Sequence, residues 1–138
     1  MLVEAARNAG VITNEEYAKF QNAGYTGLYG GMTVDSIHEK KKLKENEKIL
    51  DFMGSTELIA NLFRISQTEE KLKKDKIDNS DDATETHYKV GKEVRETIKR
   101  VGGTLPEDLP TPEKGISEIE KEQLRKLKKS KKKFMLDE

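Results

Sequence analysis

Residues 54–72 read GSTELIANLFRISQTEEKL, the most apolar stretch of a chain in which 38% of the residues are charged. Gly54 ends the preceding segment, because glycine adopts the left-handed conformation at no steric cost. The apolar residues that follow recur at helical spacing and fill one broad face: Leu58, Ile59, Leu62, Phe63 and Ile65. A hydroxyl followed by two acids at residues 68–70 is typical of a further helix start. The stretch therefore predicts two short helices that meet at residues 65–67 and form a buried hairpin around which the chain packs.

A helix-turn-helix is the alternative interpretation of this pair of helices. Against it, Arg64 occupies the place where a turn glycine is usual. The second helix would also begin with Glu69 and Glu70, which would face phosphates and the acceptor-rich edges of bases. A helical hairpin in a packed core explains these residues better. We accordingly predict that Phe63 is buried and that Phe63→Ala costs about 3–5 kcal/mol.

Composition limits the class of protein. A chain of 138 residues is long enough for one domain, and it contains no Cys, which excludes disulfides, thiolate metal sites and cysteine nucleophiles. No apolar run approaches the roughly 20 residues needed to span a bilayer. We expect a soluble, cytoplasmic protein.

The charges of the chain are unevenly distributed although the formal net charge is zero. Residues 104–120 carry five acids and one base, whereas residues 121–138 carry eight bases and three acids. A basic tail of this kind attracts polyanions without sequence preference. The candidate nucleic-acid-binding residues are Lys126, Lys128, Lys129, Lys131, Lys132 and Lys133. A solvated terminus, or docking on the body or on a second copy through an apolar stripe that ends at Phe134, is the alternative.

The remaining segments predict helices and no strands. Thr13 begins a capping box for a helix that stops near residues 23–24, and Thr33 caps the next helix. A further helical piece is expected at residues 45–53 and the longest helix at residues 81–101. One face of that helix should be buried, through Ala83, His87, Val90, Val94, Ile98 and Val101. The predicted fold is all-α, an irregular bundle of six to seven mostly short helices with one longer helix and no sheet. The predicted divisions are a helical domain at 1–103, a proline-rich connector at 104–115 and a lysine-rich helix or tail at 116–138.

Residues 24–32 form a distinctive glycine-rich segment, with four glycines and two tyrosines. Its spacing matches neither common phosphate-binding fingerprint, so we interpret it as a loop in which tyrosines pack on the core. His38 and His87 are the two histidines, and His87 lies on an apolar helix face, which favours a core histidine over a ligand. No catalytic constellation stands out. We expect no enzyme activity, no metal and no cofactor.

Several strings of this chain, taken together and in order, resemble the C-terminal half of the DNA-damage-inducible protein D (DinD) family of bacteria. They are VEAA at 3–6, FQNAGYTGLYGG at 20–31, KILDFMGSTEL at 48–58, ANLFR at 60–64, QTEEKL at 67–72 and GGTLPE at 102–107. The resemblance runs from about residue 2 to residue 112. Beyond residue 114, the lysine-rich tail matches no fixed family pattern.

The resemblance implies a function that composition does not show. The family belongs to the bacterial SOS response, and its attributed activity is modulation of RecA recombinase filaments and of strand exchange. It therefore implies a non-enzymatic interaction module whose partner is a RecA-type filament. From the residues themselves, the lysine-rich tail predicts weak non-specific DNA contact, its apolar stripe makes a homo-oligomer the alternative, and no membrane partner is expected. The alternative is the assembly half of a DNA-binding or phage-antirepressor-like regulator. The nearly balanced charge of residues 1–103 argues against a dedicated DNA groove.

Overall fold

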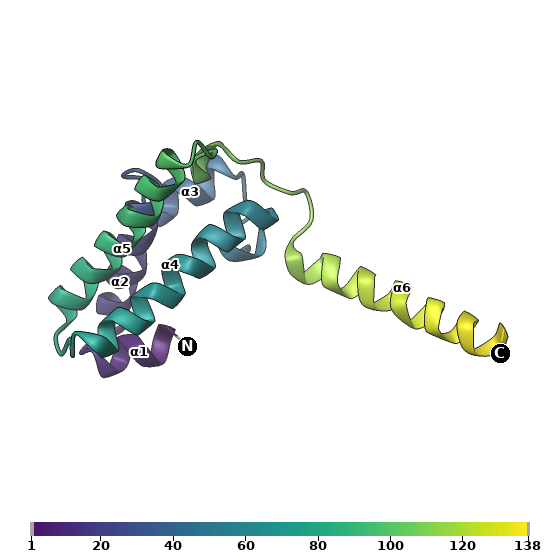
Figure 1. The fold of residues 1–138 in the computed structure, drawn as a ribbon, viewed down its shortest axis with the longest axis horizontal. Helices are drawn as coiled ribbons and strands as arrows, with labels where there is room; N and C mark the ends of the chain where they lie inside the picture. Colours follow the sequence, from purple (N-terminus) through teal and green to yellow (C-terminus); the bar gives the residue numbers. More distant parts are fainter. Residues whose placement is uncertain (1, 138) are drawn as a thin grey trace.

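The computed structural model describes the backbone of residues 2–137 and the side chains of residues 2–130. This part of the chain is all-α and contains no strand, as the sequence predicts. Its α-helices are α1 (Leu2–Asn8), α2 (Asn14–Leu28), α3 (Val34–Lys40), α4 (Ser55–Lys74), α5 (Ser80–Arg100) and α6 (Ile116–Asp137). Two short 3₁₀ turns, η1 (Ile49–Asp51) and η2 (Pro106–Asp108), interrupt the connections. Helices α1 to α5 form an irregular bundle, and α6 projects away from it (Figure 1).

The predicted helix starts are confirmed where a capping side chain sets them. The Oγ1 of Thr13 accepts from the backbone N–H of Glu16, and the Glu16 side chain accepts in return from the N–H of Thr13. Thr33 caps α3 in the same way, through the N–H of Ser36. The start of α5 lies one residue before the predicted position, because Asn79, which was not predicted as a cap, accepts from the N–H of Asp82. These contacts lie within four residues of sequence, so the local pattern alone determines them.

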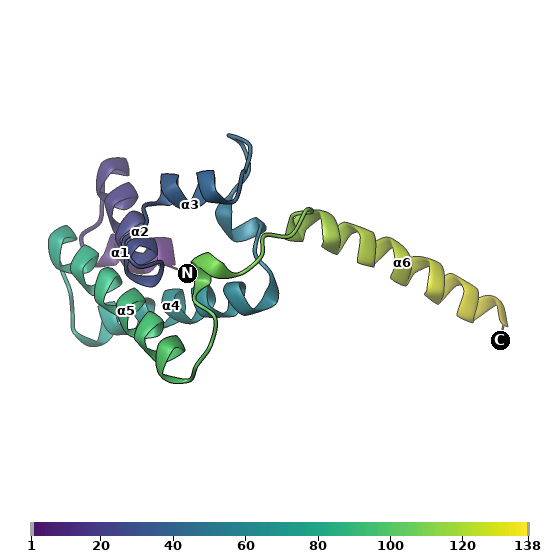
Figure 2. The same cartoon turned by 90° about the horizontal axis from the view of Figure 1, so that it is seen from above.

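The glycine-rich segment is not the predicted loop, because α2 continues through Gly24 and Gly27 to Leu28. These glycines are packing positions that let α2 and α5 approach closely (Figure 2). A Cβ on Gly27 would lie 2.3 Å from the backbone oxygen of Tyr88, and one on Gly91 would lie 2.6 Å from the backbone oxygen of Gly24. Beyond the end of α2 the chain turns at Gly30 and Gly31, whose positive φ values of 66° and 100° favour glycine.

We expect Gly27→Ala to destabilise the protein by about 1–3 kcal/mol, although alanine is the better helix former. The added methyl group would overlap backbone atoms of α5, which cannot move aside like a side chain. Chemical denaturation measures this loss. Gly54→Ser is the control, because a side chain there meets no atom within 4 Å and serine is a good N-cap. Equal stability of Gly27→Ala and the parent would contradict this account of the contact.

The predicted hairpin is wrong: residues 55–74 form the single helix α4 of 20 residues. Nothing breaks the helix at residues 65–67, and every residue there is compatible with a helix interior. The predicted burial of its apolar face is wrong for Ile59, Leu62 and Phe63, which are 65%, 51% and 53% exposed, whereas Leu58 packs against the core. The main core instead centres on α2 and its C-cap. Phe20, Tyr25 and Leu28 of the helix and the C-cap Tyr29 pack against the neighbouring helices and turns.

Two further expectations need correction. Residues 45–53 are mostly irregular, with only the 3₁₀ turn η1 where a helical piece was predicted. In α5, Ala83, His87 and Val94 are buried as predicted, whereas Val101 is 77% exposed. Val101 is the C-cap of α5, where the helix has already passed the end of its packed face.

The connector and α6 leave the bundle beside η1. The N–H and hydroxyl of Ser117 both donate to Oδ1 of Asp51 at 2.9 Å. Gly115 is buried there, and a Cβ on it would lie 2.3 Å from Oδ2 of Asp51. From this anchor α6 extends into solvent, as both views show (Figures 1 and 2). The side chains of Lys131, Lys132, Lys133 and Phe134 lie outside the described residues.

Candidate interaction surface

Helix α4 is inverted relative to an ordinary surface helix, because its polar face points into the bundle. The inward residues recur every three or four positions and each is at most 2% exposed: Glu57, Asn61, Arg64, Thr68 and Leu72. Charged side chains are rarely buried in this way unless hydrogen bonds satisfy them. The inward face of α4 should therefore be held by specific partners on α2, α3 and α5.

Glu57 is held by two side chains from other elements. Its Oε1 lies 2.7 Å from Nζ of Lys41, which follows α3, and its Oε2 accepts a short hydrogen bond from the hydroxyl of Tyr29. The Lys41 ammonium also donates to the backbone oxygen of Phe52 at 3.1 Å. Burial, together with the hydrogen bond to Glu57, raises the pKa of the Tyr29 phenol well above its ordinary value. The buried carboxylate is thus compensated by one cation and one neutral donor.

Arg64 extends this network toward α5. Its guanidinium donates to Oδ1 of Asn61 at 3.0 Å and to Nε2 of His87 at 2.5 Å, and it lies over the ring of Tyr25. The other ring nitrogen of His87 donates to the backbone oxygen of Phe20 at 2.8 Å, so this imidazole is neutral. Burial, together with the Arg64 charge, lowers the pKa of His87 to about 3. The prediction of a core histidine is therefore confirmed.

Asn61 links the two parts, since its amide donates to the hydroxyl of Tyr29 and to the backbone oxygen of Glu57, each at 3.0 Å. We call the linked side chains the core network: Lys41, Glu57, Tyr29, Asn61, Arg64 and His87. It ties α4 to α2, α3 and α5 through directional contacts. Such contacts fix the rotation of α4 about its own axis, because any other rotation would leave buried charges unsatisfied.

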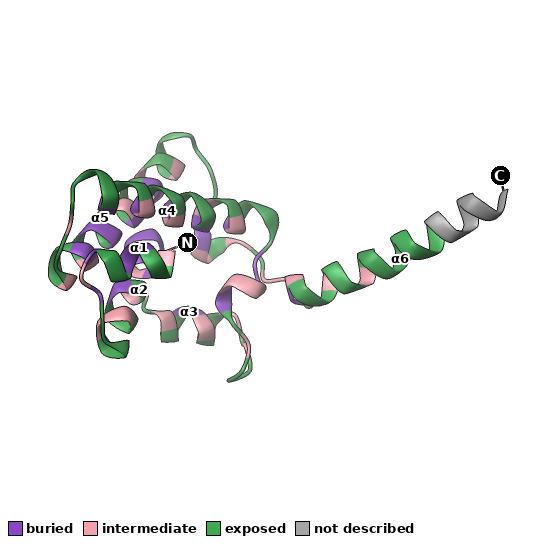
Figure 3. Ribbon diagram, turned by 90° about the horizontal axis from the view of Figure 1, so that it is seen from below, coloured by how far each residue is buried: buried purple, intermediate pink, exposed green. Residues whose placement is uncertain are grey.

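The rotation of α4 leaves an apolar stripe on its outer side. Ile59, Leu62 and Phe63 are each more than half exposed, and we call them the outward stripe. Figure 3 shows this outer side of α4 as exposed. Leu62 and Phe63 lie three and four positions after Ile59, so the three side chains are neighbours on the helix surface and form one contiguous patch. Contiguous exposed apolar patches mark sites of protein–protein interaction more often than isolated exposed residues do.

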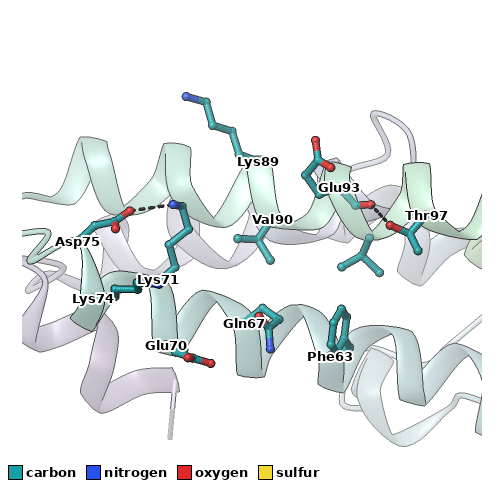
Figure 4. Close-up of a pocket in the computed structure, with 11 residues that line it drawn as sticks. Phe63, Gln67, Glu70, Lys71, Lys74, Asp75, Lys89, Val90, Glu93 and Thr97 are labelled. Atoms are coloured by element: carbon teal, nitrogen blue, oxygen red, sulfur yellow. Dashed lines mark hydrogen bonds and ion pairs between the residues drawn. The ribbon is translucent and has the colours of Figure 1, made fainter.

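A groove of about 440 Å³ continues the outward stripe across to α5. Phe63 and Gln67 on α4 face Val90 on α5 across it (Figure 4). Its other lining residues are Glu70, Lys71, Lys74, Asp75, Lys89, Glu93, Val94 and Thr97. The groove therefore has an apolar floor of Phe63, Val90 and Val94 between rims of both charge signs. This is the chemistry of a surface that receives an amphipathic helix.

The candidate residues from the sequence do not lie in this groove. Lys126, Lys128 and Lys129 are exposed on α6, which projects away from the bundle (Figure 1). His38 lies on α3, where its Nε2 is 2.8 Å from the backbone oxygen of Glu47, and His87 is enclosed in the core network. Within the described residues, no three His, Asp or Glu side chains gather as a metal site would require. In the same part of the chain, no helix is both long and apolar enough to cross a membrane.

The sequence did contain a signal for the interaction surface, in the spacing of Glu57, Asn61, Arg64 and Thr68. This polar stripe is as regular as the apolar one. Which of the two faces inward depends on Tyr29, Lys41 and His87, which reach it from distant positions. The sequence therefore predicted helical structure in this stretch, but it divided the one helix into two and assigned the inward side to the wrong face.

Comparison with known proteins agrees with the sequence resemblance. Residues 1–119 match the family described as the DinD C-terminal domain. Over 119 residues the chain is 58% identical to DNA damage-inducible protein D of Escherichia coli (strain K12), an alignment that covers 86% of this chain and 43% of that protein. The chain thus spans less than half of the length of this relative. No solved structure matches it. Because the family match covers the whole helical bundle, the chain belongs to the family of the DinD C-terminal domain.

Proposed function

We propose that this chain is a non-enzymatic interaction module of the bacterial DNA-damage response, and that it acts on RecA-type recombinase filaments. The name of the Escherichia coli relative supports the damage-response role, and the family resemblance supports the recombinase as partner. The outward stripe, together with the adjoining groove, is the surface that meets the partner. The observation that carries the proposal is the exposure of Ile59, Leu62 and Phe63 on a helix whose polar face is buried.

A protein partner fits this surface better than DNA does. The outward stripe contains no charge, and the groove rims carry Glu70, Asp75 and Glu93 as well as three lysines. Phosphates would be repelled by those carboxylates, and the apolar floor offers them no donors. An apolar side chain or helix of a protein would instead bury Phe63 and exclude water. DNA contact is assigned to the lysines of α6, and we expect it to be weak and steeply dependent on salt.

Pull-down of the chain with RecA filaments, assembled on single-stranded DNA, tests this function. Leu62→Asp/Phe63→Asp places two charges in the stripe without disturbing the core, since both side chains are more than half exposed. We expect this variant to bind filaments about tenfold or more weakly. Val101→Asp is the matched control, because Val101 is an exposed apolar residue that does not line the groove.

The same assay separates the roles of the stripe and the tail. Replacing Lys126, Lys128 and Lys129 with glutamine should reduce the binding of bare DNA at low salt and leave filament binding in place. If the stripe variant binds filaments as well as the parent while the lysine variant does not, the partner surface lies on α6 and the proposal is wrong.

A further inference from the structure

Helix α6 presents an apolar stripe that its own chain does not cover. The helix has 22 residues, and Leu124 and Leu127 are 56% and 64% exposed. Ile116 and Ile119 continue this stripe toward the anchor at Asp51, where they are partly buried. A helix without tertiary packing is only marginally stable in water, because packing of an amphipathic face supplies most helical stability in proteins. The stripe of α6 therefore needs a partner.

The groove between α4 and α5 is an unfilled site of matching length. At 1.5 Å per residue, the part of α6 beyond its anchor, from Glu120 to Ser130, extends over about 15 Å, and the groove-lining part of α4 from Phe63 to Asp75 over about 18 Å. The floor residues Phe63 and Val90 are apolar, as helix-in-groove binding requires.

Charge also favours this pairing. Residues 116–138 carry eight basic and five acidic side chains, whereas residues 1–115 carry 18 basic and 21 acidic ones. On the rims of the groove, the carboxylates of Glu70 and Glu93 pair with no other residue in the described part of the chain. Beside the stripe of α6, Arg125 and Lys128 are exposed and able to meet them. Opposite charges at such a rim orient a docking helix and favour encounter.

The anchor of α6 directs the helix away from its own groove. The two hydrogen bonds from Ser117 to Asp51 and the tight packing of Gly115 fix the start of the helix. All views show α6 leading outward from there (Figures 1–3). Docking within one chain would break these contacts, whereas a second copy can receive the helix as it stands. When each of two copies places α6 in the groove of the other, the two contacts are identical and are related by a twofold axis.

We propose that α6 of each copy packs its apolar stripe into the α4–α5 groove of a second copy. Each chain thus extends α6 as an arm, and two chains that exchange these arms form a dimer. This inference does not depend on the recombinase as partner, although both would use the groove. At high protein concentration, the dimer forms and α6 of one copy covers the groove of the other. On dilution the copies separate, and the groove becomes accessible again. Self-association thus regulates access to the surface.

Sedimentation velocity of the full chain over a concentration series tests the proposal. We expect a dimer with a dissociation constant below about 100 μM. Phe63→Lys in the groove, and separately Leu124→Asp/Leu127→Asp in the arm, should each raise that constant about tenfold or more. Val101→Lys, an exposed apolar position outside the groove, should leave the constant unchanged.

Mixing the two kinds of variant distinguishes arm exchange from other dimers. The groove variant retains an intact arm and the arm variant an intact groove, so an equimolar mixture should form a heterodimer more readily than either variant self-associates. A chain that stays monomeric, or a Phe63→Lys variant that dimerises like the parent, would overturn the proposal. If Leu124→Asp/Leu127→Asp still binds recombinase filaments, the partner surface functions without α6. Filament binding and dimerisation can therefore be tested independently of each other.

Discussion

Glu57→Ala is expected to lower the free energy of unfolding by about 3–5 kcal/mol. The substitution removes the carboxylate that lies 2.7 Å from Nζ of Lys41, and the side chains of this pair are 6% and 0% exposed. The ammonium would then remain largely buried without its counter-ion, and the hydroxyl of Tyr29 would lose its acceptor. Breaking a buried pair by removing one partner is far more costly than losing a surface ion pair.

Chemical denaturation compares this variant with Phe63→Ala, which we now expect to cost less than about 1 kcal/mol because Phe63 is half exposed. Lys41→Met in a Glu57→Gln background is the second control. It removes the unpaired charge while the glutamine oxygen still accepts from Tyr29, so part of the loss should be recovered. A larger loss for Phe63→Ala than for Glu57→Ala would contradict the orientation of α4.

Stability is expected to fall as the pH decreases below about 6.5, because His87 is held neutral in the folded state. Burial, together with the Arg64 charge, lowers the folded pKa of His87 to about 3 from its ordinary value of 6.5. The unfolded chain therefore binds a proton between these two values that the folded chain does not. This contribution to stability is fully present above pH 6.5 and decreases as the pH falls toward 3. By pH 3 the loss of stability amounts to roughly 4 kcal/mol.

Urea unfolding between pH 7 and pH 5 measures this contribution before most carboxylates titrate. We expect His87→Gln to be less stable at neutral pH and to lose less stability over this interval than the parent. His38→Gln is the matched control for replacing a histidine by glutamine, since His38 lies on α3 outside the core network. Parallel slopes for His87→Gln and the parent would mean that His87 is not the neutral, buried group described above.

The sequence predicted those features of the fold that depend on neighbouring residues. The Thr13 and Thr33 caps, the helical class and the length of α5 follow from hydroxyls and periodicity within a few positions. The family was identified from long strings in order, and the comparison confirms it.

The features that were missed depend on contacts between distant residues. Gly24 and Gly27 were interpreted as loop residues, because glycine lowers helix propensity and the partner backbone at Tyr88 and Gly91 is more than 60 residues away. The orientation of α4 was reversed for a related reason. Apolar residues normally face inward, and only the partners Tyr29, Lys41 and His87 make the polar face the buried one. The outward stripe, and with it the groove, was therefore missed.

Thiol labelling of two single-cysteine variants tests the inverted orientation of α4 most directly, since the natural chain contains no cysteine. Phe63→Cys replaces a half-exposed residue of the outward stripe, and Thr68→Cys replaces a fully buried one on the same helix. Under native conditions, with labelling of the unfolded chains as the reference, Phe63→Cys should react rapidly and Thr68→Cys should be strongly protected. Protection of Phe63→Cys together with rapid reaction of Thr68→Cys would contradict the account.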